Sequence, residues 1–190
     1  MNAGEKVRLF VAARIPNDRL ELLDAALEPL RTKLINARWM PVDNQHLTLK
    51  FLGWAPVDLL DGVATTCAMV AAGHQGGRLE LTDLGAFPSK TRIRVLWVGV
   101  DDPSGVLGAL AADLDRAFEP LGFPSEGRAY TPHLTVARFK LPIPMKSGFP
   151  SLTASIPPFD LGEITLFRSH LSPAGARYEA INAFPLRAGT

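Results

Sequence analysis

A short motif occurs twice in this chain of 190 residues, and the sequence around it repeats with it. The tetrad HLTL at residues 46–49 returns as HLTV at residues 133–136, an offset of 133 − 46 = 87 residues. A proline and three leucines ahead of each tetrad keep that offset: Pro16, Leu20, Leu23 and Leu27, then Pro103, Leu107, Leu110 and Leu114. Self-similarity over this length indicates two structural units of one design. We therefore expect a single bilobal domain over residues 1–190, with an internal repeat of residues 16–52 and 103–139.

Hydrophobic periodicity predicts helices and strands in adjacent runs. Leucines at helical spacing predict a helix from Pro16, which Pro29 should kink or interrupt. Asp102 should cap a second such helix, with Pro103 in its first turn. We expect further strands over 7–13, 38–42, 46–52, 78–84, 92–100, 133–139, 160–167 and 178–184, a break over 53–56, a helix over 57–72, and a long surface loop beside the site over 141–158.

The order of these elements predicts the fold class. Strands follow one another without a helix between each pair, which argues against a doubly wound parallel sheet. We expect an α+β fold of two pseudo-symmetric lobes. Each lobe should be a mostly antiparallel sheet with helices on its outer face, and the active-site cleft should lie between the lobes.

Composition narrows the function classes. Hydrophobic residues make up 47% and charged residues 21% of the chain, which is ordinary for a globular protein. The formal net charge of +1 gives no general affinity for nucleic acid, so an RNA site would have to be local. Cys67 is the single cysteine, which excludes an intrachain disulfide and favours a reducing compartment. With no secretory pattern and no apolar run long enough for a membrane span, we expect a cytoplasmic protein.

The two tetrads carry the candidate chemistry. Residues two apart in a strand share a face, so His46 lies beside Thr48, and His133 beside Thr135. An imidazole titrates near neutrality and can supply or accept a proton. Threonine hydroxyls can donate hydrogen bonds to phosphate oxygens. Two such pairs facing each other are typical of acid–base catalysis on a phosphoester.

Other roles for these residues are less consistent with the sequence. A metal site would need a third ligand beside either histidine, and the helical His-x-x-x-His spacing is absent, so we expect no metal. There is no G-x-S-x-G nucleophile motif, and Cys67 lies within a predicted helix, where a buried and inert thiol is expected. His74 and His170 are expected at the surface without a role.

At these residues the chain resembles the 2H phosphoesterase superfamily, and within it the RNA 2′,3′-cyclic phosphodiesterases, also called 2′-5′ RNA ligases. The resemblance covers nearly the whole chain. It includes VRLFVA, RWMPVDNQHLTLKFLG, LGAFPS, RVLWVGV, YTPHLTVAR, LFRSHLSP and ARYEAINAFPL.

This resemblance implies hydrolysis of a terminal 2′,3′-cyclic phosphate on RNA to a 2′-phosphate, without metal or other cofactor. It implies that His46 is the proton donor, that His133 is the proton acceptor, and that Thr48 and Thr135 hold phosphoryl oxygens. The same site could run in reverse as a 2′-5′ RNA ligase. The sequence symmetry by itself does not decide which histidine has which role.

Five further residues are candidates for binding the substrate. Arg138 follows the second tetrad and approaches the nucleotide by the same resemblance, but strand parity places it opposite His133 unless a bulge turns it inward. Phe51 and Phe10 could stack on a base, although core packing suits both. Arg92 and Arg94 could steer phosphates or simply form a solvated strand face.

Two alternative functions remain open. One is a non-catalytic module that binds RNA ends or nucleotides. The other is a cyclic phosphodiesterase for a small nucleotide such as a cyclised ADP-ribose. In every case the expected partners are RNA ends or small cyclic nucleotides, with no membrane association and a monomeric chain.

Overall fold

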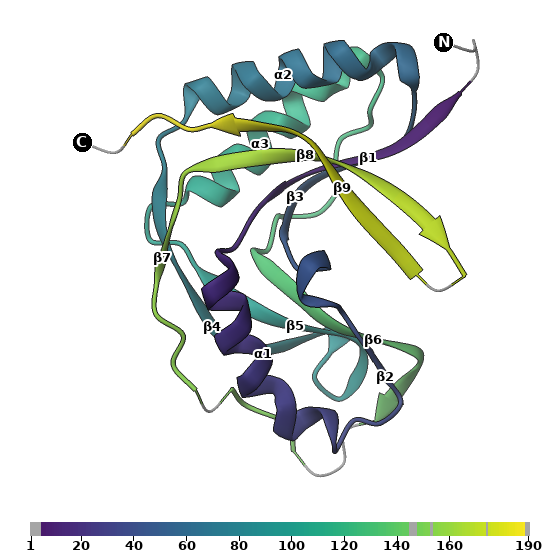
Figure 1. The fold of residues 1–190 in the computed structure, drawn as a ribbon, viewed down its shortest axis with the longest axis vertical. Helices are drawn as coiled ribbons and strands as arrows, with labels where there is room; N and C mark the ends of the chain where they lie inside the picture. Colours follow the sequence, from purple (N-terminus) through teal and green to yellow (C-terminus); the bar gives the residue numbers. More distant parts are fainter. Residues whose placement is uncertain (1–4, 145–147, 153, 174, 189–190) are drawn as a thin grey trace.

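The structure is a computed structural model that describes residues 5–144, 148–152, 154–173 and 175–188 (Figure 1). Helices and strands alternate in short runs, as the α+β prediction requires. The strands are β1 (Lys6–Ala13), β2 (Ala37–Trp39), β3 (Leu47–Pro56), β4 (Gly77–Ser89), β5 (Arg92–Asp101), β6 (His133–Pro144), β7 (Phe159–Leu161), β8 (Glu163–Ser172) and β9 (Gly175–Pro185). The α-helices are α1 (Asn17–Arg31), α2 (Leu60–Gly73) and α3 (Val106–Phe118), and short 3-10 turns occupy Val42–Asn44, Val57–Leu59 and Glu119–Leu121.

The strands form a curled sheet with the order β7-β4-β5-β6-β3-β1-β8-β9, and β2 pairs with β6. Every pairing between these named strands is antiparallel, which confirms the predicted fold class. The two strands that carry the tetrads, β3 and β6, lie at the centre and meet at the pair Leu47 and Leu134. We call β3, β1, β8 and β9 the β3 half, and β6, β5, β4, β7 and β2 the β6 half.

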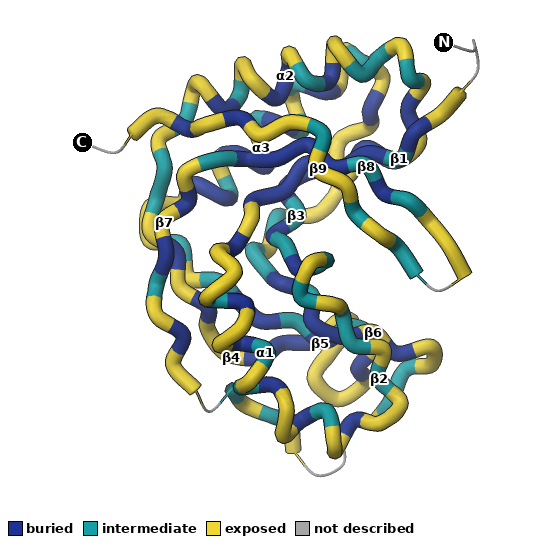
Figure 2. The backbone as a smooth tube through the Cα atoms, in the orientation of Figure 1, coloured by how far each residue is buried: buried dark blue, intermediate teal, exposed yellow. Residues whose placement is uncertain are grey.

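A continuous apolar core supports both halves, as the buried central strands in Figure 2 show. Helix α1 contributes its leucine stripe to this core, and α3 contributes a second stripe. Helices α2 and α3 pack against each other; α3 contacts β3, and α2 contacts β8 and β9. The outer side of α2 faces solvent (Figure 2).

Two elements continue where the sequence predicted a possible break. Helix α1 continues through Pro29 to Arg31. Pro29 lies in the last turn, where its missing N–H removes only one hydrogen bond before the helix ends. Strand β3 continues through Gly53 to Pro56, because Gly53 adopts a φ of 74° at a bulge and the strand resumes its pairing with β1.

The start of α3 also differs from the prediction. The helix begins at Val106, and Gly105 with a φ of 70° precedes it, so Asp102 is not the N-cap residue. The Asp102 carboxylate nevertheless accepts hydrogen bonds from the backbone N–H groups of Val106 (3.2 Å) and Leu107 (2.8 Å). Asp102 therefore satisfies amides of the first turn from a position further upstream.

The predicted loop over 141–158 is only partly correct. Strand β6 extends to Pro144 because Arg92 and Ile93 of β5 pair with Pro144 and Ile143. Residues 145–147 and 153 of this segment lie outside the described residues. The other predicted elements are present with shifted ends, except that the strand expected over 160–167 is divided between β7 and β8, and that expected over 38–42 ends at Trp39.

Candidate active site

The two tetrads contribute their polar side chains to one small cleft between the halves of the sheet. Their apolar members, Leu47, Leu49, Leu134 and Val136, are at most 4% exposed and anchor the strands in the core. Their polar members line a cleft of about 150 Å³. The lining residues are Arg8, Phe10, Met40, Asn44, His46, Thr48, Phe51, His133, Thr135, Arg138 and Tyr178.

Both catalytic candidates are held by the backbone in the same way. The Nδ1 of His46 lies 2.9 Å from the carbonyl oxygen of Asn44, and the Nδ1 of His133 lies 2.7 Å from that of Thr131. Because a carbonyl oxygen only accepts hydrogen bonds, each Nδ1 carries the proton. The Nε2 atom of each ring is then the one available for proton transfer.

Aromatic side chains surround His46. Phe10 stacks on the imidazole at 4.7 Å between centroids, Tyr178 meets it edge-on at 5.1 Å, and Phe167 lies at 6.0 Å. Burial among these rings lowers the pKa of His46 to about 4, although the hydrogen bond to Asn44 opposes the shift. The positive charge of Arg138 contributes to this lowering of the His46 pKa. His46 is therefore neutral at pH 7 in the free protein.

The surroundings of His133 differ from those of His46. Phe87 meets its ring edge-on at 5.2 Å, and Trp97 lies at 6.0 Å. His133 also lines a second and larger pocket. The two histidines thus share their backbone geometry but not their environment.

Matching bulges in β3 and β6 complete the cleft. In β3, Leu49 is the extra residue between the positions that pair with Val11 and Ala12 of β1. In β6, Val136 is the extra residue between those that pair with Leu96 and Trp97 of β5. Each bulge reverses the alternation of the strand, so the next two residues change faces. Lys50 and Ala137 are consequently buried, whereas Phe51 and Arg138 line the cleft.

The structure brings three of the five predicted substrate-binding residues to the cleft. Arg138 lines the cleft because the bulge at Val136 turns it inward, as strand parity had required. Phe51 is 41% exposed there, but Phe10 is only 2% exposed and packs beneath His46. Arg92 and Arg94, at the start of β5, are not among the residues that line the cleft or the larger pocket.

Several cleft residues were not predicted from the sequence. Arg8 places its guanidinium 4.5 Å from the Phe51 ring and donates a hydrogen bond to the Ser169 hydroxyl (3.2 Å). The Asn44 side chain donates to the carbonyl of Ala176 in β9 (2.8 Å). Strand parity with Phe10 could have indicated Arg8. Tyr178 carries no local signal, because a distant segment brings it to the cleft. Asn44 and Met40 lie two and six residues before His46 in the sequence.

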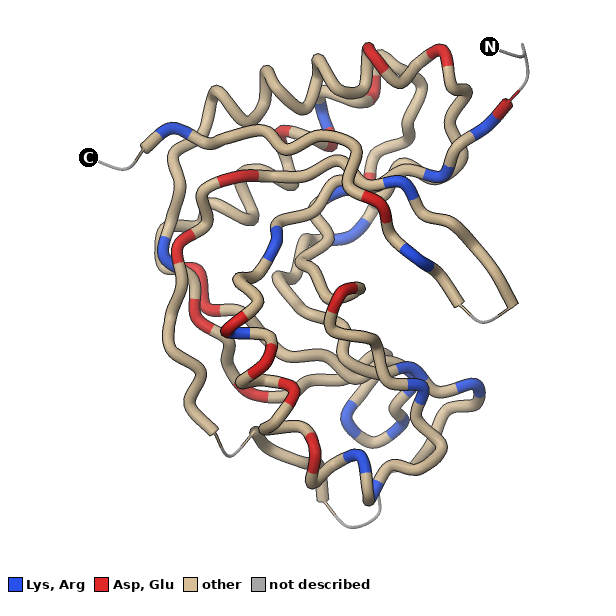
Figure 3. The backbone as a smooth tube through the Cα atoms, viewed as in Figure 1, with Lys and Arg blue, Asp and Glu red and all other residues tan. Residues whose placement is uncertain are grey.

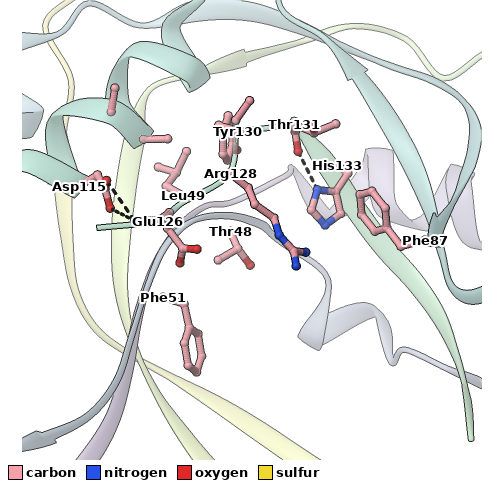
Figure 4. Close-up of a pocket in the computed structure, with 13 residues that line it drawn as sticks. Thr48, Leu49, Phe51, Phe87, Asp115, Glu126, Arg128, Tyr130, Thr131 and His133 are labelled. Carbon is pink, nitrogen blue, oxygen red and sulfur yellow. Dashed lines mark hydrogen bonds between the residues drawn. The ribbon is translucent and has the colours of Figure 1, made fainter. Parts of the chain in front are cut away.

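A larger pocket of about 670 Å³ adjoins the cleft and shares Thr48, Phe51 and His133 with it (Figure 4). One wall is formed by Glu126, Arg128, Ala129, Tyr130 and Thr131, and Ala111 and Ala112 of α3 also line the pocket. Beside this wall, the Lys50 ammonium, whose side chain is 1% exposed, donates to the Asp115 carboxylate and to the carbonyl of Pro124. This pocket was not predicted from the sequence.

The remaining histidines and the cysteine lie outside the cleft. The expectation of a surface position is wrong for His74, whose side chain is 14% exposed and whose Nε2 lies 2.9 Å from the Asp113 carboxylate. His170 lies 2.6 Å from the Glu179 carboxylate. Cys67 is buried, and burial raises the pKa of its thiol to about 12, as expected for an inert thiol.

Neither a metal-binding cluster nor a membrane-spanning helix occurs among the described residues. Within the part of the chain that the structure describes, no three His, Cys, Asp or Glu side chains gather closely enough to hold a metal ion. No helix in the described ranges is long and apolar enough to cross a membrane.

Comparison with known proteins relates this cleft to a family. A family model described as the 2′-5′ RNA ligase superfamily matches residues 17–173. A protein of Methanothermobacter thermautotrophicus named RNA 2′,3′-cyclic phosphodiesterase is 30% identical over 186 residues, which cover 95% of this chain and 100% of that protein. A protein of the same name from Methanocaldococcus jannaschii is 31% identical over 180 residues, covering 92% and 98% of the two chains.

Solved structures show the same likeness. The protein TT0787 of Thermus thermophilus superposes with a TM-score of 0.80 at 29% identity, over 96% of this chain and 100% of that one. E. coli LigT complexed with 3′-AMP superposes with a TM-score of 0.78 at 25% identity, over 96% and 99% of the two chains. Because the family model matches residues 17–173 of this chain, and relatives 30% and 31% identical cover nearly all of it, the chain belongs to the 2′-5′ RNA ligase superfamily.

Proposed function

We propose that this protein is an enzyme that hydrolyses the terminal 2′,3′-cyclic phosphate of RNA to a 2′-phosphate, by acid–base catalysis with two histidines and no metal. The observation that carries the proposal is the cleft in which the Nε2 atoms of both histidines are left for proton transfer, beside both threonine hydroxyls. The names of the relatives and the 3′-AMP complex of LigT support this substrate class.

The reaction needs one proton acceptor and one proton donor. By the family resemblance, the Nε2 of His133 accepts a proton from water as the water oxygen attacks phosphorus. The bond from phosphorus to the 3′-oxygen breaks, and the Nε2 of His46 protonates that oxygen. The products are a 2′-phosphate and a 3′-hydroxyl, and each histidine is left in the protonation state opposite to its starting one.

The low pKa of His46 has a consequence for this assignment. A donor must be protonated, yet burial keeps His46 neutral at pH 7 in the free protein. The anionic cyclic phosphate would raise the pKa of an imidazole beside it. We therefore propose that His46 acquires its proton when the substrate binds.

The other cleft residues bind the phosphate. The hydroxyls of Thr48 and Thr135 can donate hydrogen bonds to its non-bridging oxygens, and the Arg138 guanidinium can neutralise the charge that develops on them. With an RNA 5′-hydroxyl in place of water as the nucleophile, the same groups would form a 2′-5′ linkage as the bond from phosphorus to the 3′-oxygen breaks.

The charge distribution supports an RNA substrate despite the small net charge. Lys and Arg gather around β2, β6 and the β4–β5 turn, whereas Asp and Glu follow α1 (Figure 3). Arg92 and Arg94 belong to this basic region. We propose that they steer the phosphates of the RNA strand behind its end, without contacting the reacting group.

We also propose that residues 1–190 act as one bilobal domain and as a monomer. Matching bulges at Leu49 and Val136, which are 136 − 49 = 87 residues apart, support the repeat of 16–52 and 103–139. Both tetrads of the cleft come from one chain, so the site needs no partner copy.

Product analysis tests the proposal. The protein is incubated with a 2′,3′-cyclic mononucleotide and with a short RNA ending in a cyclic phosphate, each with and without EDTA. We expect the 2′-monophosphate from the mononucleotide and a terminal 2′-phosphate on the RNA, both with and without EDTA. Turnover that EDTA abolishes would contradict the metal-free mechanism. Binding without turnover would indicate a binding module, and turnover restricted to small nucleotides would indicate a different substrate.

A further inference from the structure

The cleft accounts for the phosphate but leaves the base of the substrate without a place. At about 150 Å³ it is smaller than the ~300–1,000 Å³ typical of ligand pockets, whereas the adjoining pocket of about 670 Å³ lies within that range. The two cavities share Thr48, Phe51 and His133, so a molecule bound at the phosphate site would extend directly into the larger pocket.

The walls of the larger pocket have the chemistry of a base-binding site. Phe51 and Phe87 both line it and are 41% and 37% exposed, which offers aromatic surface for a planar ring. In Figure 4 the Arg128 side chain points toward the side of the pocket where Thr48 and His133 lie. A guanidinium in that position suits the phosphate side of a nucleotide.

Glu126 contributes a carboxylate to the same pocket, and the structure fixes its backbone. The Asp115 carboxylate accepts the N–H of Glu126 at 3.0 and 3.2 Å from its two oxygens, and the buried Lys50 holds Asp115 in turn. Burial opposes ionisation of Asp115, but the hydrogen bonds from Lys50 and Glu126 lower its pKa overall. An ionised Asp115 therefore anchors the wall that carries Glu126.

A carboxylate in such a pocket selects among bases by hydrogen bonding. It can only accept, so it favours a base edge with adjacent donors. Guanine presents two neighbouring donors, N1–H and the exocyclic amino group, and can bind a carboxylate through both. Adenine and cytosine present one donor beside a bare ring nitrogen, and uracil presents one donor between two carbonyl oxygens.

We propose that the larger pocket holds the base of the nucleotide that carries the cyclic phosphate, that it prefers guanine, and that Glu126 is the residue that determines this preference. The inference rests on the proposed function, because the cleft must hold the phosphate for the base to enter this pocket.

The test measures kcat/KM for the 2′,3′-cyclic forms of GMP, AMP, CMP and UMP. We expect the wild-type protein to prefer 2′,3′-cyclic GMP over 2′,3′-cyclic UMP by about tenfold or more in kcat/KM. A pair of hydrogen bonds to a base edge gives discrimination of this size. In Glu126→Ala and Glu126→Gln, kcat/KM for 2′,3′-cyclic GMP should fall until the preference is lost. In the same variants, kcat/KM for 2′,3′-cyclic UMP should change by less than about twofold. The matched control is Glu21→Gln, on the exposed side of α1, which should keep the wild-type preference.

The outcomes separate this inference from the proposed function. Turnover of all four nucleotides without a guanine preference, or a preference that survives in Glu126→Ala, would overturn the base pocket and leave the proposed function intact. If no nucleotide is turned over, calorimetric binding of 2′-GMP and 2′-UMP gives an independent readout. Tighter binding of 2′-GMP that Glu126→Ala abolishes would still support the pocket, and equal or absent binding would overturn it.

Discussion

Phe51 and Arg138 occupy matching positions in the two central strands, 138 − 51 = 87 residues apart, and each follows a one-residue bulge that turns it into the cleft. The same backbone irregularity therefore presents an aromatic ring on one side and a guanidinium on the other. The two tetrads carry the same histidine and threonine at matching positions, whereas the residues that follow the two bulges differ. We propose that this difference sets the orientation in which an asymmetric substrate binds between the two repeats.

Removing either histidine should slow turnover strongly. We expect His46→Ala and His133→Ala each to lower kcat on a 2′,3′-cyclic nucleotide by ~10²–10⁴-fold, because each removes one proton-transfer group. His170→Ala is the control, since His170 is not among the residues that line the cleft. Thermal unfolding of all three variants would exclude a folding defect. Turnover near the wild-type rate in either cleft variant would contradict the mechanism.

The pH dependence of kcat/KM should reflect the buried imidazole. Because the pKa of His46 in the free protein is about 4, the acidic limb of the kcat/KM profile should lie near pH 4 and not near the ordinary histidine value of about 6.5. Bound phosphate should raise this pKa. An NMR titration of the His46 ring with and without inorganic phosphate measures both values, and an unchanged pKa would contradict proton uptake on binding.

The same pKa predicts an acid sensitivity of the fold. Between pH 6.5 and 4 the unfolded chain takes up a proton at His46 that the folded protein does not, so the free energy of unfolding should decrease as the pH falls through this range. His46 alone should account for about 3 kcal/mol of this decrease. Denaturant unfolding of wild type and His46→Gln at pH 7 and pH 4 measures it. Equal losses in both proteins would show that His46 is not the group responsible.

Substitutions of Arg138 and Arg94 should have different effects on a mononucleotide and on an RNA substrate. We expect Arg138→Met to lower kcat/KM about tenfold or more on both a cyclic mononucleotide and a short RNA, because it removes a charged hydrogen-bond donor from the cleft. Arg94→Met, outside the cleft, should leave mononucleotide turnover unchanged and weaken RNA binding mainly at low salt. An equal loss in the two variants on the mononucleotide would argue against this division.

The buried ion pair of Lys50 predicts unequal costs for its two partners. Asp115→Ala leaves an ammonium group in the core without its counter-charge and should cost about 3–5 kcal/mol of unfolding free energy. Lys50→Met removes the buried charge itself, and the Asp115 side chain, which is 21% exposed, can then be hydrated. Lys50→Met should therefore lower the free energy of unfolding by less than Asp115→Ala does. Glu28→Ala, in an exposed pair with Arg31, is the control and should cost under about 1 kcal/mol. Denaturant unfolding ranks the three variants.

Much of the catalytic frame was predictable because it depends on local geometry. Alternation along a strand places His46 with Thr48 and His133 with Thr135, whatever surrounds them. The spacing of the leucines likewise predicts the buried faces of α1 and α3. The equal offset of the two tetrads indicated that they belong together. Parity also showed that Arg138 could reach the cleft only through a bulge, although it did not show that the bulge exists.

The sequence by itself determined which side chains are candidates for the chemistry and which neighbours share their strand face, because these follow from the spacing of residues and from bond geometry over short stretches. Tertiary structure alone decided the rest. It placed Tyr178 and Phe167 beside His46, formed the larger pocket around Glu126, and lowered the pKa of His46. These properties depend on which distant segments exclude water from a group, and no local pattern encodes that.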